Sequence, residues 1–141
     1  MPELLVDTSG FYAVADRSDA HHDEAREIFA ARGSAGDLVT TDHIVVETWM
    51  LLRARLGRPA AMRYWDAVMT GAVRVLGVTG SDLSRARRIA SSWPDQDFSL
   101  VDLTSFATME QRGIEEALAL DDHFRVYRFG PGRRRAFRVL P

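Results

Sequence analysis

The chain contains neither cysteine nor lysine, and each absence removes a class of chemistry. Without cysteine there is no disulfide, no zinc-thiolate site and no cysteine nucleophile. Without lysine there is no Schiff base, no phosphate-binding Walker lysine and no active-site lysine of the kind expected in an aspartyl-phosphate enzyme. All 18 basic residues are therefore arginines. They face 20 acids, and the net charge of -2 by itself indicates no polyanionic partner.

Long apolar runs are also missing. The first residues, MPELLVDTS, lack a basic segment followed by an apolar block. We therefore expect no membrane span and no secretion signal, and a cytoplasmic protein. With 141 residues, 46% of them hydrophobic, the chain is long enough for one domain with one core, which we expect to span residues 1–141.

Short apolar runs alternate with segments of helical periodicity along the chain. The runs predict strands at residues 3–7, 38–41, 73–78 and 115–120, and an edge strand at 136–140. Helices are predicted between them, including one that ends near Ala31 and one from Ser99 to Gly113. This alternation predicts an α/β fold, with a central, mostly parallel sheet of four to five strands flanked by helices in an α/β/α sandwich.

Four acids fall where this fold would place its ligand crevice. Asp7 and Asp121 each end an apolar run, while Glu47 and Asp102 lie in the first turns of helices. Ligands of open α/β sheets bind outside the carboxyl ends of the strands, so we expect these four carboxylates to converge there. Because unneutralised carboxylates repel one another, a cation should lie between them. Oxygen ligands alone favour Mg²⁺ or Mn²⁺.

Three of these acids also have a simpler interpretation. Ser99-x-x-Asp102 fits a capping box, and Asp7 is a good helix N-cap. Glu47 falls inside an apolar stripe that includes Ile44 and Leu51, where a carboxylate costs several kcal/mol unless it is paired, protonated or bound to a metal. A buried ion pair with an arginine is the alternative for Glu47.

The end of the chain is locally basic. Residues 123–141 carry six arginines and no acid, interleaved with aromatic residues. Arg133, Arg134 and Arg135 follow a Gly-Pro-Gly turn. They predict a positive surface for a nucleic-acid backbone, with aromatic rings available for stacking on unpaired bases. A solvated basic tail is the alternative. A carboxylate-held metal beside such a surface favours hydrolysis of a phosphodiester.

Four segments resemble, in order, the acidic signature of PIN-domain ribonucleases, most closely the VapC toxins of bacterial toxin-antitoxin pairs. They are VDTSGFYA with Asp7, HIVVETWML with Glu47, DQDFSLVDLTSF with Asp102 and LALDDHF with Asp121. The resemblance implies a PIN fold, a Mg²⁺- or Mn²⁺-dependent endoribonuclease, a homodimer, and neutralisation by a cognate antitoxin protein. It also implies that these four acids form the catalytic metal cluster.

Within that resemblance, Asp7 and Asp102 would hold the principal metal. Glu47 would orient the attacking water or share a metal-bound one, and Asp121 would complete the site or a second metal position. Four further side chains would support it: Ser9, Ser99, Thr104 and Asp97. The ending GPGRRRAFR is longer and more basic than the family leads us to expect.

Two other functions remain open from the sequence. A metal-independent nuclease would need a histidine pair, for which His43 and His123 are the candidates. A PIN-like scaffold that binds RNA or protein without cutting would retain the fold and lose turnover. An aspartyl-phosphate enzyme is disfavoured by the missing lysine.

Overall fold

A computed structural model describes residues 2–141, and its centre is a five-stranded sheet in the order β3-β2-β1-β4-β5. Every neighbouring pair is parallel. The strands are β1 (Leu4–Val6), β2 (Leu38–Thr41), β3 (Arg74–Leu76), β4 (Glu116–Leu118) and β5 (Arg138–Leu140). The predicted parallel sheet is therefore confirmed, as is the edge position of the last strand.

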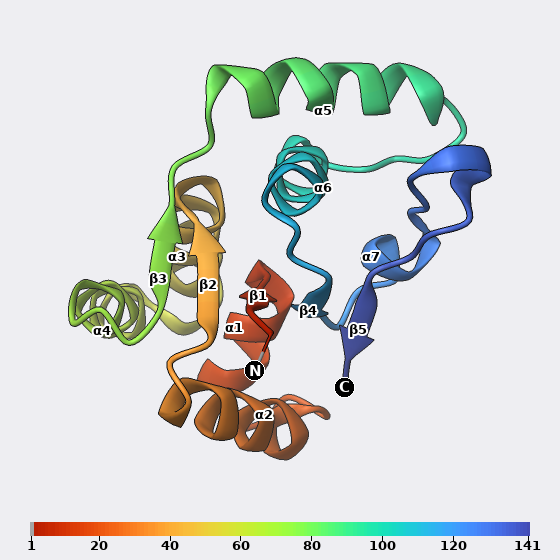
Figure 1. The fold of residues 1–141 in the computed structure, drawn as a ribbon. Coiled ribbons are helices and arrows are strands. Elements are labelled where there is room, and N and C mark those ends of the chain that lie inside the picture. Colours follow the sequence, from red (N-terminus) through yellow and green to blue (C-terminus); the bar gives the residue numbers. More distant parts are fainter. Residues whose placement is uncertain (1) are drawn as a thin grey trace.

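Seven helices and one short 3₁₀ turn connect and flank the strands. They are α1 (Thr8–Ala15), α2 (His22–Ser34), α3 (Asp42–Leu56), α4 (Arg58–Met69), α5 (Gly80–Ser92), α6 (Leu100–Arg112), α7 (His123–Val126) and η1 (Pro131–Arg133). Figure 1 shows α5 outside α6 at one end of the molecule and α2 at the other. None of the helices within residues 2–141 has both the length and the apolarity needed to cross a membrane.

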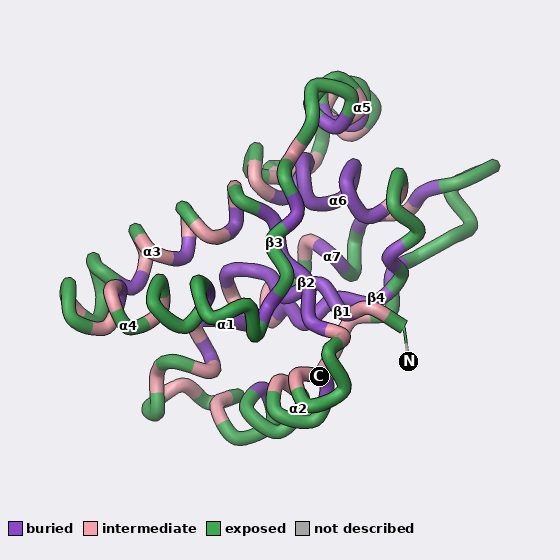
Figure 2. Tube along the Cα trace, turned by 60° about the vertical axis from the view of Figure 1, so that its left-hand side comes forward, coloured by how far each residue is buried: buried purple, intermediate pink, exposed green. Residues whose placement is uncertain are grey.

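The core lies in the central strands and in α6. All three residues of β1 are buried, and α6 is buried continuously from Asp102 to Met109. Figure 2 shows the buried residues concentrated in β1, β2, β4 and α6, with α5 largely exposed at the periphery. Strands that are covered on both faces read as continuous apolar runs, which explains why the sequence pattern located them.

Several boundaries differ from the predictions. Four predicted strands, 3–7, 73–78, 115–120 and 136–140, are longer than β1, β3, β4 and β5. Beyond β3, β4 and β5 the extra residues include Val73, Leu120 and Phe137, which pack in or against the core outside the strand ladder. Helix α2 continues past Ala31 to Ser34. Its last turn is held by Arg32, whose guanidinium donates to the Glu116 carboxylate at 2.7 Å while both side chains are almost fully buried.

Local capping sets the helix starts that matter for the site. The Thr41 hydroxyl accepts from the amide of Ile44 and begins α3 directly after β2. Ser99 and Asp102 form a reciprocal capping box at the start of α6. At the other end of α6, Gly113 adopts φ 67°, a left-handed conformation that suits glycine. The capping box predicted at Ser99 and Asp102 is therefore confirmed.

Candidate active site

One cavity of about 360 Å³ collects the four predicted acids at the edge where β1 and β4 end. Asp7 follows β1 and N-caps α1, and Asp121 follows β4. Asp102 lies in the first turn of α6, and Glu47 lies in the second turn of α3. The sequence separates these residues widely, and the parallel topology brings them together.

Asp7 is the most deeply buried of the four, with 3% of its surface exposed. Its Oδ2 accepts from the Ser9 hydroxyl at 3.0 Å, and that hydroxyl accepts from the Leu120 amide at 2.9 Å. Ser9 therefore ties the start of α1 to the segment after β4. Burial, followed by the charges of Asp121 and Asp102, raises the pKa of Asp7 to about 7.

Gly10 permits this close approach of α1 to β4. A Cβ atom at this position would lie 2.5 Å from the carbonyl oxygen of Leu118, which is closer than non-bonded atoms come. The same carbonyl accepts from the Asp7 amide at 3.1 Å. The absence of a side chain at Gly10 therefore helps to place Asp7 beside the end of β4.

Asp102 is both a cap and a wall of the cavity. Its Oδ2 accepts from the Ser99 amide at 3.0 Å, while the Ser99 hydroxyl accepts from the Asp102 amide at 3.0 Å. The same Oδ2 lies 2.6 Å from Nδ1 of His123. The capping interpretation is thus correct, and it coexists with a place in the acidic cluster.

His123 joins the acids at the start of α7. One ligand atom from each of Asp102, Asp121 and His123 lies within 4.8 Å of the others, a spacing that could hold a metal ion. Burial lowers the pKa of His123, but the charge of Asp102 and the hydrogen bond to it outweigh burial, so the pKa is raised overall. Burial also raises the pKa of Asp121, with the Asp102 charge as the next cause.

Asp7, Asp102 and Asp121 each use one carboxylate oxygen for structure. Asp7 and Asp102 accept their hydrogen bonds through Oδ2, and Asp121 accepts from the His123 amide through Oδ1 at 3.1 Å. Within residues 2–141 the second oxygen of each, Oδ1 of Asp7 and Asp102 and Oδ2 of Asp121, forms no hydrogen bond. Mutually repelling carboxylates with unused oxygens are a donor set that suits a hard divalent cation.

Glu47 is oriented differently from the prediction. The buried row of α3 is Ile44, Thr48 and Leu52, and Glu47 is only half-buried on the neighbouring row that faces the cavity. Its carboxylate is therefore not an interior charge, and no buried ion pair with an arginine is needed to explain it. The prediction that Glu47 lies near the other acids is unaffected.

The predicted supporting residues separate into two groups. Ser9 and Ser99 line the cavity. Thr104 is fully buried, lies outside the cavity lining, donates to the Val101 carbonyl, and has its hydroxyl 3.3 Å from Nδ1 of His43. Asp97 is exposed and is also outside the lining. Because His43 does not line the cavity with His123, the histidine pair considered above is not assembled there.

The basic segment near the C-terminus is largely engaged with the protein itself. Arg133 donates to the Ser92 carbonyl at 2.7 Å and lies over the Trp93 ring at 4.3 Å. Arg135 donates to Glu115 at 3.2 Å. Arg134 is exposed. None of these three arginines lines the acidic cavity.

Six further lining residues were not identified as site residues from the sequence: Thr8, Tyr12, Asp19, Leu51, Arg55 and Leu120. A signal for Arg55 was present, because Glu47, Leu51 and Arg55 form an i, i+4, i+8 row on α3 and all three line the cavity.

Comparisons with known proteins agree with this geometry. A PIN domain family model matches residues 4–130. The 23S rRNA-specific endonuclease VapC20 of Mycobacterium tuberculosis is 34% identical over 121 residues, which cover 86% of this chain and 91% of the relative. Ribonuclease VapC26 of the same species is 26% identical over 140 residues, 98% of this chain and 100% of the relative.

Solved structures give the same answer. The crystal structure of VapC20, described as a sarcin-ricin loop cleaving toxin, matches with a TM-score of 0.79 at 32% identity and covers 85% of this chain and 91% of its own. DNA-bound VapBC from Salmonella typhimurium matches with a TM-score of 0.68 at 14% identity over 99% and 97% of the two chains, which supports the fold alone. The chain therefore belongs to the PIN-domain family, and its relatives place it with the VapC ribonucleases of that family.

Proposed function

We propose that this chain is a divalent-metal-dependent endoribonuclease that acts in the cytoplasm as the toxin of a toxin-antitoxin pair, with one PIN-like domain spanning residues 1–141. The observation that carries the proposal is the cluster of Asp7, Asp102 and Asp121, each with one oxygen fixed by the protein and one unused. In a scaffold that never bound a cation, only His123 and protonation of Asp7 would relieve this repulsion, and the unused oxygens would have no partner.

Asp7 and Asp102 would hold Mg²⁺ or Mn²⁺ through their unused oxygens, and Asp121 would complete the site. When bound, such a cation supplies Lewis acidity, which makes water a stronger nucleophile and neutralises charge on the phosphate. The raised pKa of Asp7 supports this assignment, because a carboxyl held near neutrality by burial and neighbouring acids becomes an anionic ligand once a cation relieves that repulsion.

The remaining side chains would orient the reactants. Glu47, half-buried on the opposite wall formed by α3, would accept a hydrogen bond from the attacking water. Attack on phosphorus forms the new P–O bond and breaks the bond to the 3′ oxygen, which leaves with a proton. The products are a 5′-phosphate and a 3′-hydroxyl. Ser9 and the Ser99 capping box would keep Asp7 and Asp102 aimed into the cavity.

The substrate of the relative suggests the first RNA to test. VapC20 is named as specific for 23S rRNA and as cleaving the sarcin-ricin loop. We therefore propose a structured RNA loop of that kind as the substrate class of this chain.

Purified protein should cleave a sarcin-ricin loop oligonucleotide with Mg²⁺ or Mn²⁺ and lose that activity in EDTA. Asp102→Asn should reduce cleavage by roughly 10³-fold, because a metal ligand and its charge are lost. Asp122→Asn, at an exposed neighbour outside the cavity lining, is the matched control and should cleave normally. Cleavage that survives EDTA, or products ending in a cyclic phosphate, would reject the proposal. Metal binding without cleavage of any RNA would favour the scaffold.

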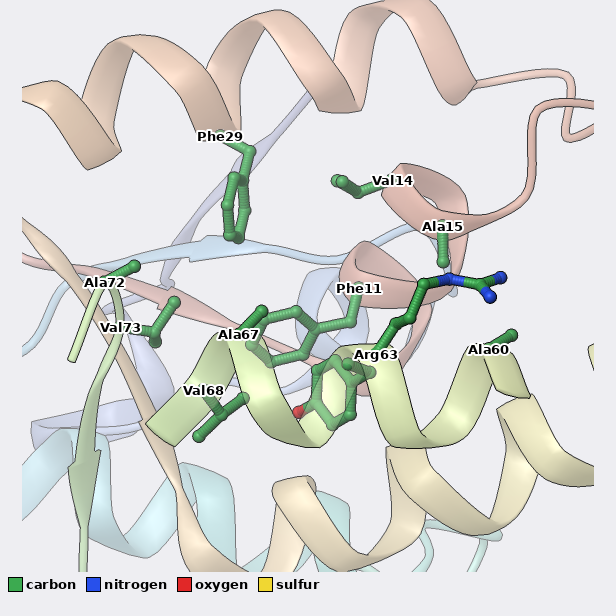
Figure 3. Close-up of a pocket in the computed structure, with 11 residues that line it drawn as sticks. Phe11, Val14, Ala15, Phe29, Ala60, Arg63, Ala67, Val68, Ala72 and Val73 are labelled. Carbon is green, nitrogen blue, oxygen red and sulfur yellow. The ribbon is translucent and has the colours of Figure 1, made fainter. Parts of the chain in front are cut away.

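An apolar groove is a candidate binding site for the antitoxin. Side chains of α1, α2 and α4 converge on a cavity of about 310 Å³, among them Phe11, Val14, Phe29 and Ala67 (Figure 3). Helix α1 lines both this groove and the acidic cavity, and its eight residues span roughly 12 Å. A partner segment seated in the groove would therefore lie close enough to obstruct the acids, which supports neutralisation by a bound antitoxin.

A second apolar surface favours a homodimer. Val46, Met50, Trp65 and Met69 of α3 and α4 are exposed by 60%, 61%, 48% and 73%. Val46, Met50 and Trp65 also line one cavity of about 400 Å³. Contiguous exposed apolar residues of this size are typical of a protein interface, and we propose that a second copy of the chain covers them.

Reciprocal variants separate the two surfaces. Val14→Glu, in the groove, should abolish capture of the co-expressed antitoxin and leave the dimer intact. Met50→Glu, on the α3 and α4 surface, should convert the dimer to a monomer and leave antitoxin capture intact. Light scattering and co-purification measure the two outcomes. A wild-type chain that is monomeric at high concentration would contradict the dimer, and capture unaffected by Val14→Glu would contradict the groove.

A further inference from the structure

Among the described residues, the acidic cavity is lined by two side chains that can carry positive charge, Arg55 and His123. His123 is already bonded to Asp102. Arg55 is exposed near the end of α3, and no carboxylate within residues 2–141 lies within 4.0 Å of its guanidinium. Arg55 is therefore the positively charged side chain of this cavity that forms no ion pair with a described carboxylate.

The Arg55 side chain is held in place without a carboxylate. Its guanidinium carbon lies over the Tyr12 ring, 5.2 Å from the centroid. The Tyr12 hydroxyl donates to Oδ2 of Asp16 at 2.6 Å, which anchors the ring from its far end. A guanidinium that lies against an aromatic face keeps N–H donors available at its edge for an oxyanion.

The position along α3 separates Arg55 from the acids. Glu47 and Arg55 are eight residues apart on one row of the helix, and a rise of about 1.5 Å per residue places their backbones roughly 12 Å apart along the axis. A guanidinium carries only N–H donors and cannot ligate a cation, so Arg55 is not part of the donor set of Asp7 and Asp102. It is well placed for a charge carried by the substrate on either side of the reacting group.

We propose that Arg55 is a substrate-positioning residue that binds an RNA phosphate next to the scissile one. The inference rests on the proposed ribonuclease function, because it requires a polyphosphate strand in the cavity. A bound divalent cation neutralises only part of the charge of Asp7, Glu47, Asp102, Asp121 and Asp19, so an approaching strand still meets net negative charge. The positively charged guanidinium of Arg55 offsets that repulsion and sets the register of the RNA strand in the cavity.

Binding of a fluorescein-labelled sarcin-ricin loop RNA, with cleavage blocked by Asp102→Asn, tests this contact directly. Adding Arg55→Gln should weaken binding by about tenfold, as expected for loss of a charged hydrogen bond. It should also reduce the steepness of the plot of log association constant against log salt concentration by about 0.7 to 0.9, the change expected for the loss of one phosphate contact. Arg55→Lys should restore most of the slope, because a positive charge returns.

Arg53→Gln is the matched control. Arg53 lies two residues earlier on α3, over the Trp49 ring at 5.9 Å and outside the acidic cavity, so its loss should change neither affinity nor slope. In the cleaving protein, Arg55→Gln should raise KM about tenfold and leave kcat within about threefold.

Equal salt slopes for Arg55→Gln and Arg53→Gln would overturn the assignment. An Arg55→Gln protein with a lowered kcat and an unchanged KM would overturn it as well. The outcome is separable from that of the proposed function. If RNA binds with a slope that depends on Arg55 but is never cut, the ribonuclease proposal fails and the phosphate contact stands. If the chain binds no RNA at low salt, both fail.

Discussion

Asp7→Asn should make the metal-free protein more stable at pH 8 while abolishing its activity. Burial and two neighbouring acids raise the pKa of Asp7 from 3.8 to about 7, so the folded state resists its ionisation. Between those pH values the folded state holds a proton that the unfolded state has lost, and the free energy of unfolding therefore falls as pH rises. The full shift corresponds to about 4 kcal/mol at most.

Asparagine removes the charge and retains an N-cap oxygen for Ser9. Allowing for the buried amide, we expect a gain of about 2 kcal/mol at pH 8, or roughly 5 °C in Tm by thermal melting in EDTA. At pH 4 Asp7 is protonated in the folded state and only the cost of the buried amide remains, so the variant should be less stable than the wild type by up to about 2 kcal/mol. The order should also reverse in saturating Mn²⁺, which stabilises only the wild type. Asp122→Asn should leave Tm unchanged. An Asp7→Asn protein that is less stable than wild type in EDTA at pH 8 would contradict this description of the cluster.

The affinity for Mn²⁺ should fall steeply below neutral pH. A cation competes with the proton on Asp7, so the apparent dissociation constant should be nearly constant above pH 7 and rise about tenfold for each unit below it. Between pH 7 and pH 5 we expect a loss of about 100-fold, as measured by isothermal titration calorimetry.

Proton release provides an independent check of that result. At pH 6, titrations in buffers of different ionisation enthalpy should show at least about one proton released per ion bound. A pH-independent affinity from pH 8 to pH 5, or binding without proton release, would show that Asp7 is not a ligand.

The sequence pattern predicted where the acids lie, because the positions at which a carboxylate caps a helix are also positions at which it can bind a metal ion. A carboxylate at a helix N-terminus accepts from backbone amides through one oxygen, as Asp102 does from Ser99, and this leaves the other oxygen for a further partner. The parallel topology then brings those N-termini to one sheet edge. The two interpretations of Asp7 and Asp102 were therefore compatible rather than competing.

Side-chain direction was less predictable. Glu47 fell within the apolar stripe of α3, but small rotations of a helix decide which of two adjacent rows is buried, and the row of Ile44 and Thr48 was the buried one. Arg55 was missed for the same reason. The contacts of Arg133 with Ser92 and Trp93 join segments about 40 residues apart, and no local pattern encodes them.

The most direct test of the central claim is a crystal of the wild-type chain soaked in Mn²⁺ and measured for anomalous scattering. We predict a peak bounded by the unused oxygens of Asp7, Asp102 and Asp121 at the ends of β1 and β4, and its loss in Asp102→Asn. A crystal saturated with Mn²⁺ in which these carboxylates bind no ion would contradict the account.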